Sequence, residues 1–307
     1  MEHKNRIYTP HSNQQFACNH HCKPESMIGM TLSGSLHILG VVNSVTCLEN
    51  ERVVYKAFDS RTQLWYAVKA LNKTSARLRV HKESICVHDK VSAHPNIIPL
   101  IKIVDSDRYL YTVMPYYPEG GLFDSITQSR RTFDDDSIRN TFLQLLDAVE
   151  HCHRLRVYHL DLKPEHILVS GNQILLAGFS LSRTEEIAGY LGSKFYAKNR
   201  LALFTDASYR CAPHDIWSLG VILVNLTCGR NPWKEATFDD PTYVAFMNDR
   251  NFLRTTLPLS EEANSILCQI FDRDPSTRIS IQELKHEVSQ CPSFRTELPY
   301  SHHVSNT

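Results

Sequence analysis

Five titratable side chains lie within the eight residues His159–His166, where they could carry acid–base or metal chemistry. They are His159, Asp161, Lys163, Glu165 and His166. The neutral imidazole of His166 can bind a transition metal, but it suits Mg²⁺ poorly because that ion prefers oxygen ligands. Beyond Glu165 the chain has no Asp or Glu before Glu185. Two interpretations of His166 stay open, a Mn²⁺ or Zn²⁺ site and a histidine that only fills space, and we favour the second.

A second group of potential metal ligands lies near the start, where Cys18, His20, His21 and Cys22 fall within five residues. Structural zinc sites usually take pairs of ligands from two separate places, and adjacent side chains cannot easily reach one tetrahedral centre. The surrounding residues 1–30 show neither helical nor strand periodicity. We therefore interpret them as a disordered polar lead and predict no metal site there.

Length and composition limit the classes of function. The chain has 307 residues, 42% of them hydrophobic, which is enough for a real core in one large or two intermediate domains. Its 33 basic and 33 acidic residues balance, so we expect neither nucleic acid nor a membrane surface as partner. The charged start is no secretory signal, and no apolar run is long enough to span a membrane. Nine scattered cysteines favour a reducing compartment, the cytosol or nucleus.

The stretch His159–His166 resembles the catalytic loop of a protein kinase, which reads H-R-D-L-x-x-x-N. The resemblance implies that Asp161 accepts the proton of a substrate hydroxyl, that Lys163 is retained beside it, and that His159 holds the loop in its fold. It also marks two departures. Leu160 stands at the position of the Arg, and His166 stands at the position of the Asn that holds a magnesium ion.

Short apolar runs after Leu36 predict strands, including a hairpin of residues 52–57 and 64–71 around turn residues 59–62. Within the second run, Ala67–Lys69 is similar to the V-A-I-K strand whose Lys binds the α and β phosphates of ATP. A later apolar strand at 109–114 resembles the one that leads into the kinase hinge. The resemblance implies nucleotide contacts from Val54, Ala67, Lys69, the gatekeeper Met114 and the main chain near Tyr116.

The loop that closes over the phosphates in this family is rich in glycine, yet the chain has no glycine from Val41 to Glu119. Glu49 and Glu51 stand where phosphates would lie, and their charges would repel them. We therefore interpret residues 47–52 as an ordinary hairpin turn.

The helix predicted over residues 77–91 should offer a Glu to Lys69. Aligning it on the following H-P-N-I step places Ser84 at that position, while Glu83 lies one residue, or about 100° of helix rotation, away. The expected ion pair is therefore not predicted to form.

Apolar residues at three- and four-residue spacings predict a helix from Asp134 to Leu155, which leads to the catalytic loop. A short hairpin of residues 167–169 and 174–176 follows. Gly178 then stands where the family has the Asp of D-F-G, its main magnesium ligand, while Phe179 is retained for packing.

Further along, Arg200 stands where the family has a Glu that pairs with an Arg, here Arg278. Two positive charges cannot form that bridge, so one side chain must find another acceptor or turn to solvent. Residues 215–226 are apolar on nearly every side and predict a buried helix. The resemblance to the kinase family implies that Asp215 ties the catalytic loop to this helix. A capped helix is predicted to begin after Ser260.

The ordered motifs together imply an α+β, two-lobed protein kinase fold. We predict a lead over residues 1–30, a small lobe over 31–114, a large lobe over 115–290 and a loose tail over 291–307. Strings such as Gly229–Trp233 resemble those of fungal Ser/Thr kinases that restrain mating and meiosis.

The losses at Leu160, His166, Gly178 and Arg200 favour a pseudokinase, a monomer that acts by binding a protein partner. The alternative is an active but atypical Ser/Thr kinase that acts on a protein substrate, and a decaying gene copy is a third reading. ATP binding stays open, and the lost ligands argue against Mg²⁺.

Overall fold

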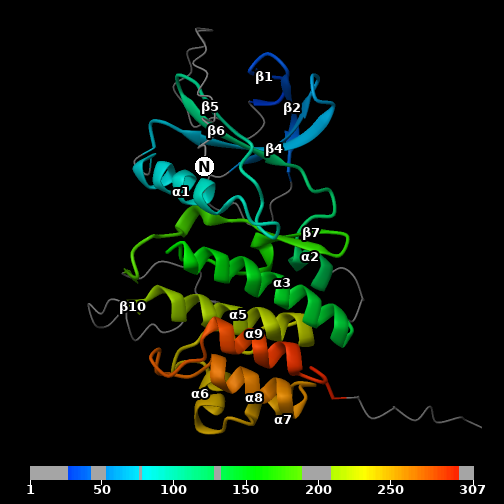
Figure 1. Ribbon diagram of the computed structural model, residues 1–307, viewed down its shortest axis with the longest axis vertical. Helices are drawn as coiled ribbons and strands as arrows, with labels where there is room; N and C mark the ends of the chain where they lie inside the picture. Colours follow the sequence, from blue (N-terminus) through cyan, green and yellow to red (C-terminus); the bar gives the residue numbers. More distant parts are fainter. Residues whose placement is uncertain (1–26, 43–52, 76–77, 128–132, 189–208, 297–307) are drawn as a thin grey trace, which may run out of the picture. The chain divides into compact units, whose positions relative to one another are not determined.

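The computed structural model describes residues 27–42, 53–75, 78–127, 133–188 and 209–296 (Figure 1). It divides into two compact units, Met1–Pro118 and Glu119–Thr307. The described part of the first is a sheet with one helix, and the described part of the second is mainly helical.

The first unit holds a six-stranded antiparallel sheet with the strand order β1-β2-β3-β4-β6-β5. Its strands are β1 (Thr31–Leu32), β2 (Leu36–Val41), β3 (Val54–Asp59), β4 (Leu64–Asn72), β5 (Lys102–Asp105) and β6 (Tyr109–Pro115). The carboxylate of Asp59 accepts hydrogen bonds from the main-chain N–H groups of Arg61 and Thr62. These bonds form the turn between β3 and β4 and confirm the predicted hairpin.

Both faces of this sheet contribute to a core. On one face Tyr55, Val68 and Ala70 are buried together with residues of β1 and β2. On the other face Leu71 packs against Ile85 of α1 (Leu78–Val91), the helix predicted from the sequence. Side chains along β3 and β4 point alternately to the two faces of the sheet. One face therefore packs with residues of β1 and β2, and the other lies beside α1.

Residues 27–30 pack on the sheet, although the sequence predicted a polar lead as far as residue 30. The N–H of Gly29 donates to the carbonyl of Ile38 at 2.8 Å, and the N–H of Ile38 donates to the carbonyl of Met30 at 2.9 Å. Met27 is buried in the same core. The apolar side chain of Met27 has core to bury against, which local periodicity could not reveal.

The boundary between the units falls at Pro118, four residues beyond the predicted end of the small lobe. Pro115 still pairs with Tyr66, and the N–H of Tyr116 donates to the carbonyl of Trp65 at 3.2 Å. Sheet pairing therefore continues into the segment that the sequence assigned to the large lobe.

The second unit is built mainly from helices, of which α3 and α5 are the longest described. Its described α-helices are α2 (Leu122–Thr127), α3 (Asp135–Arg154), α5 (Cys211–Cys228), α6 (Pro241–Asn248), α7 (Phe252–Thr256), α8 (Glu261–Ile270) and α9 (Ile281–Gln290). The described part also contains the hairpin strands β7 (Ile167–Ser170) and β8 (Gln173–Leu176), the short pair β9 (Ile187–Ala188) and β10 (Tyr209–Arg210), and the 3-10 helices η2 (Pro164–His166) and η3 (Phe179–Leu181). The side chain of Ser260 caps α8, as predicted, and the side chain of Asp134 caps α3 in the same way.

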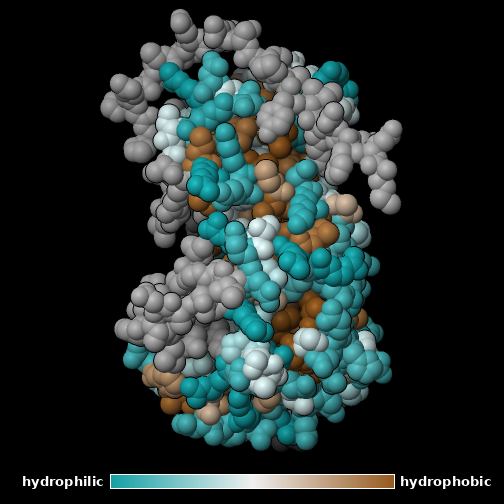
Figure 2. Space-filling model, turned by 60° about the vertical axis from the view of Figure 1, so that its left-hand side comes forward, coloured by the Kyte–Doolittle hydropathy of each residue, from teal (hydrophilic) through white to brown (hydrophobic). Residues whose placement is uncertain are grey.

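The helix α5 is buried along almost its whole length, as its continuous apolar sequence predicted. Gly220 allows α8 to come close, because a Cβ there would lie 2.4 Å from Cγ2 of Ile270. Hydrophilic residues cover most of the described surface of this unit on the face shown in Figure 2. Among the described helices, none is both long and apolar enough to cross a membrane.

The chain stays packed against this unit beyond residue 290, where the sequence predicted a loose tail. Phe294 is fully buried, and its N–H donates to the carboxylate of Asp135 at 3.0 Å. The Oγ of Ser260 donates to the carbonyl of Ser293 at 2.6 Å, and Arg139 donates to the carbonyl of Cys291. A single aromatic side chain in a polar stretch therefore fixes the last described residues.

Candidate active site

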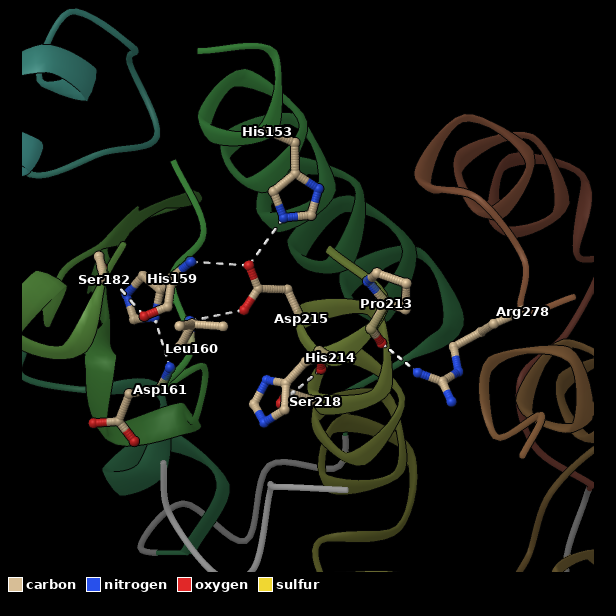
Figure 3. Close-up of polar contacts among 10 residues, drawn as sticks. All are labelled: His153, His159, Leu160, Asp161, Ser182, Pro213, His214, Asp215, Ser218 and Arg278. Atoms are coloured by element: carbon tan, nitrogen blue, oxygen red, sulfur yellow. Dashed lines mark hydrogen bonds and ion pairs between the residues drawn. The ribbon is translucent and has the colours of Figure 1, made fainter. Parts of the chain in front are cut away.

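The carboxylate of Asp215 joins three parts of the helical unit (Figure 3). One oxygen accepts from the N–H of His159 at 2.9 Å and from Nε2 of His153 at 2.9 Å, and the other accepts from the N–H of Leu160 at 2.8 Å. Burial alone would raise the pKa of Asp215, but the hydrogen bond from His153 and the electrostatic influence of the surrounding imidazoles hold it below its usual value. Asp215 therefore joins α5 to the loop and to α3.

His153 is a residue of this network that the sequence did not single out. It follows Cys152, the last apolar residue of the α3 stripe, and lies in the last turn of that helix. Nothing in its local pattern distinguishes it from an exposed histidine, because its partner lies 62 residues further along the chain.

His159 is fully buried as a neutral imidazole. Its Nε2 donates to the carbonyl of Ala177 at 2.8 Å, which leaves Nδ1 to accept from the N–H of Asp161 at 3.3 Å. Burial is the main cause that lowers the pKa of this imidazole. The ring also lies edge-on to Phe179, with 4.9 Å between the centroids, so both predicted structural residues meet here.

Leu160 replaces the Arg of the family motif and is completely buried beside Tyr158 and Cys211. Its backbone has φ of 63°, a left-handed conformation that is costly for a leucine. The hydrogen bond from its N–H to Asp215 supports that conformation. An apolar side chain has thus taken a buried position where a cation would need a partner.

Asp161 is buried and lies beside two nitrogen groups. Lys163 Nζ lies 3.3 Å from its Oδ2, and Nδ1 of His166 lies 3.5 Å from the same oxygen. The Nδ1 of His166 is also 2.8 Å from the main-chain carbonyl of Asp161. Since a carbonyl can only accept, this nitrogen carries the proton. The predicted base and its neighbouring Lys are therefore brought together.

The imidazole of His166 fills the space in which a side chain at position 178 would begin. Gly178 has φ of +86°, and a Cβ built on it would lie 2.3 Å from Cγ of His166 and 2.4 Å from its Nδ1. A side chain at position 178 therefore has no room while His166 keeps its place. Among the described residues, no group of three or more His, Cys, Asp or Glu could hold a metal ion. The residues present do not fit the Mg²⁺ that the family fold implies.

In the first unit, four of the five predicted nucleotide contacts share one face of the sheet. Val54 lies opposite Lys69, and Ala67 lies opposite Met114, so their side chains point the same way. All four are only partly buried. Small apolar side chains beside an ammonium group suit a nucleotide base and its phosphates.

Lys56 lies on the same face and was not predicted from the sequence. It is directly opposite Ala67, and its Nζ lies 4.3 Å from the ring centroid of Trp65 and 4.8 Å from that of Tyr116. The fifth predicted contact, the main-chain N–H of Tyr116, donates to the carbonyl of Trp65. This N–H group therefore takes part in the hydrogen bonding of the sheet.

Glu83 lies on the exposed side of α1, as the shifted register predicted, and so does Asp89. Glu83 pairs with Arg79 at 3.0 Å, while Ser84 is buried and donates its Oγ proton to the carbonyl of His81. The buried position that would face the sheet thus belongs to a serine.

Arg278 binds main-chain carbonyls. Its guanidinium donates to the carbonyl of Pro213 at 2.6 Å (Figure 3). Two of its nitrogens also donate to the carbonyl of Asp272. It also lies 5.2 Å from the ring centroid of Trp217, and burial lowers the pKa of Arg278 to about 10. The guanidinium of Arg278 therefore has hydrogen-bond acceptors that do not depend on Arg200. Arg200 itself lies outside the described residues. Outside them too lie Glu49, Glu51 and the Cys18–Cys22 group.

A sheet unit with one helix, a helical unit, and a loop of the H-x-D-x-K type tied to a buried helix define the α+β fold of protein kinases. The chain matches the family described as "Protein kinase domain" over residues 51–288 and belongs to that family. Members of this family generally bind ATP with Mg²⁺.

Its relatives include several Ser/Thr kinases. The chain is 37% identical over 305 residues to the "Negative regulator of sexual conjugation and meiosis" of Schizosaccharomyces pombe, covering 90% of this chain and 64% of the relative. It is 36% identical over 240 residues to the serine/threonine-protein kinase VHS1 of Saccharomyces cerevisiae, covering 72% and 52%. It is 30% identical over 250 residues to the human SNF-related serine/threonine-protein kinase, covering 76% and 32%. The two fungal relatives confirm the resemblance to fungal Ser/Thr kinases.

Proposed function

We propose that this chain is a pseudokinase that binds a protein partner and carries out little or no phosphoryl transfer. The observation that carries the proposal is the pair His166 and Gly178, which replaces both metal-binding side chains of the family. Phosphoryl transfer depends on positioning and on charge stabilisation by metal ions, more than on covalent work by the protein. Without those ligands the charge that develops on the phosphates has lost its main counterion.

The reduction in rate caused by the loss of both metal ligands can be estimated to an order of magnitude. One preorganised electrostatic group contributes about 3 kcal/mol to the transition state, so two lost ligands reduce the rate by on the order of 10⁴. Such losses are not additive, and the figure gives only the scale. It is large enough to turn an enzyme with a turnover of about 1 to 100 per second into one of little use as a catalyst.

The alternative function is an active but atypical Ser/Thr kinase. It is favoured by the retained Lys69, Asp161 and Lys163, and by the 3.3 Å between Lys163 Nζ and the Asp161 carboxylate. That arrangement could still accept the proton of a substrate hydroxyl.

A transfer assay separates the two functions. The wild-type chain and Asp161→Asn are incubated with labelled ATP, a generic protein substrate, and either Mg²⁺ or Mn²⁺. We expect no more phosphate on the substrate with the wild type than with the variant, because His166 and Gly178 supply neither of the two oxygen ligands that hold the metal in the family. Transfer by the wild type that Asp161→Asn abolishes would establish the active kinase instead.

The proposal extends to the biological role. The Schizosaccharomyces pombe relative is named as a negative regulator of conjugation and meiosis, and a binding protein can restrain a process by occupying a partner. We propose a protein partner in the cytosol or nucleus, since the free thiols of the described cysteines fit a reducing compartment.

A further inference from the structure

The hairpin β7–β8 brings His166 and Gly178 together. Ile167 lies opposite Leu176, and the N–H of Ala177 donates to the carbonyl of His166 at 2.7 Å. Position 166 thus leads into the hairpin and position 178 follows its exit, and both lie at the same end. Their side chains compete for one volume.

That volume holds the imidazole of His166. A Cβ at position 178 would come within 2.7 Å of three of its ring atoms, Cγ, Nδ1 and Cδ2. Real Cβ atoms do not approach so closely, and Cγ is the ring atom nearest the backbone, so a small rotation does not remove the overlap. The Nδ1–H bond to the carbonyl of Asp161 opposes a larger rotation.

We propose that His166 is a positioning residue that has replaced the metal ion. It occupies the space of the lost carboxylate and holds the Asp161 segment by a direct hydrogen bond, so His166 and Gly178 form a coupled pair. Neither residue can return to the family type alone without disturbing the other. The inference deepens the proposed function and rests on it for the missing metal, but the two fail on different measurements.

The overlap is tested by adding one methyl group. Gly178→Ala is compared with Gly171→Ala, a control in the β7–β8 turn whose φ is +58° and whose Cβ would meet nothing within 4 Å. Both variants put alanine into a left-handed conformation, so the difference between them reports the contact with His166. We expect the Tm of Gly178→Ala to fall about 3–10 °C further than that of the control, without any nucleotide.

The coupling is tested with His166→Ala and the double variant His166→Ala/Gly178→Ala. The double variant should lose clearly less stability than the sum of the two single losses, because the space is then free. Equal Tm values for the Gly178→Ala and Gly171→Ala variants, or additive losses in the double variant, would overturn the proposal. The transfer assay of the wild type does not enter this comparison.

A second experiment measures metal binding. The probe is ATP with and without Mn²⁺, followed by thermal shift on the wild type, Gly178→Asp and His166→Asn/Gly178→Asp. We expect a Mn²⁺-dependent rise in Tm only in the double variant, since only there are two oxygen ligands supplied and the imidazole removed. An equal rise in Gly178→Asp alone would show that His166 does not fill the site.

Discussion

His159 makes the helical unit sensitive to acid. Its imidazole is buried and neutral, with a pKa below the ordinary value, whereas the same residue in the unfolded chain titrates near pH 6.5. Below that pH the unfolded chain binds a proton that the folded chain does not, so stability is present above about pH 6.5 and falls as the pH drops.

His159→Gln tests this effect, since its amide can still donate to the carbonyl of Ala177. Between about pH 7 and about pH 5.5 the wild type should lose about 1 kcal/mol more unfolding free energy than the variant. Urea denaturation at both pH values measures the difference. The lowered pKa of His151 contributes in the same pH range, whereas that of Asp215 contributes only below about pH 4, and both groups remain in both proteins. An identical pH dependence in the two proteins would contradict a neutral buried His159.

The contact between His166 and Gly178 could be predicted only in part from the sequence. The predicted hairpin of residues 167–169 and 174–176 already implies that its two ends meet. What could not be predicted is that the imidazole turns toward Gly178, because the orientation of a side chain depends on the hydrogen bond that its ring finds. The two substitutions were therefore noted separately from the sequence, and the structure relates them.

At the scale of elements, close approach of α5 to α8 depends on Gly220. Replacing it by alanine should improve helix propensity by up to about 1 kcal/mol. The added methyl would overlap with the buried side chains of Ile270 and Phe271, which costs about 1–3 kcal/mol.

Gly220→Ala should therefore lower the Tm by a few degrees despite the better propensity. Thermal unfolding followed by circular dichroism measures the change. The double variant Gly220→Ala/Ile270→Ala is the control, and its loss should be smaller than the sum of the single losses because part of the overlap is gone. A higher Tm for Gly220→Ala would show that the two helices can move apart freely.

Elements with a strong internal pattern were predicted, and elements without one were missed. The stripe of α3, the continuous apolar run of α5 and the capped start of α8 carried their own signals. The two-residue strand β1 has too few residues to show a period, and it forms because Met27 and Leu32 find a core that the rest of the sheet supplies. The buried Phe294 follows the same rule.

At the scale of the whole molecule, the balance of 33 basic and 33 acidic residues removes net repulsion between copies near neutral pH. Solubility at low salt should therefore be lowest near pH 7 and should rise toward about pH 6, where exposed members of the 16 histidines gain charge. Precipitation by polyethylene glycol across this range measures it. Solubility that rises steadily from acid to alkaline pH would contradict the expectation.

The burial of α5 on all sides has a consequence for the protein in a cell. A helix with no polar face looks, when exposed, like the segments that chaperones and proteases recognise in unfolded chains. Substitutions such as Gly220→Ala, which leave every predicted binding residue intact, would first change how much of the protein survives quality control. The effect of such a substitution in the cell would be a smaller amount of folded protein, with its binding residues unchanged.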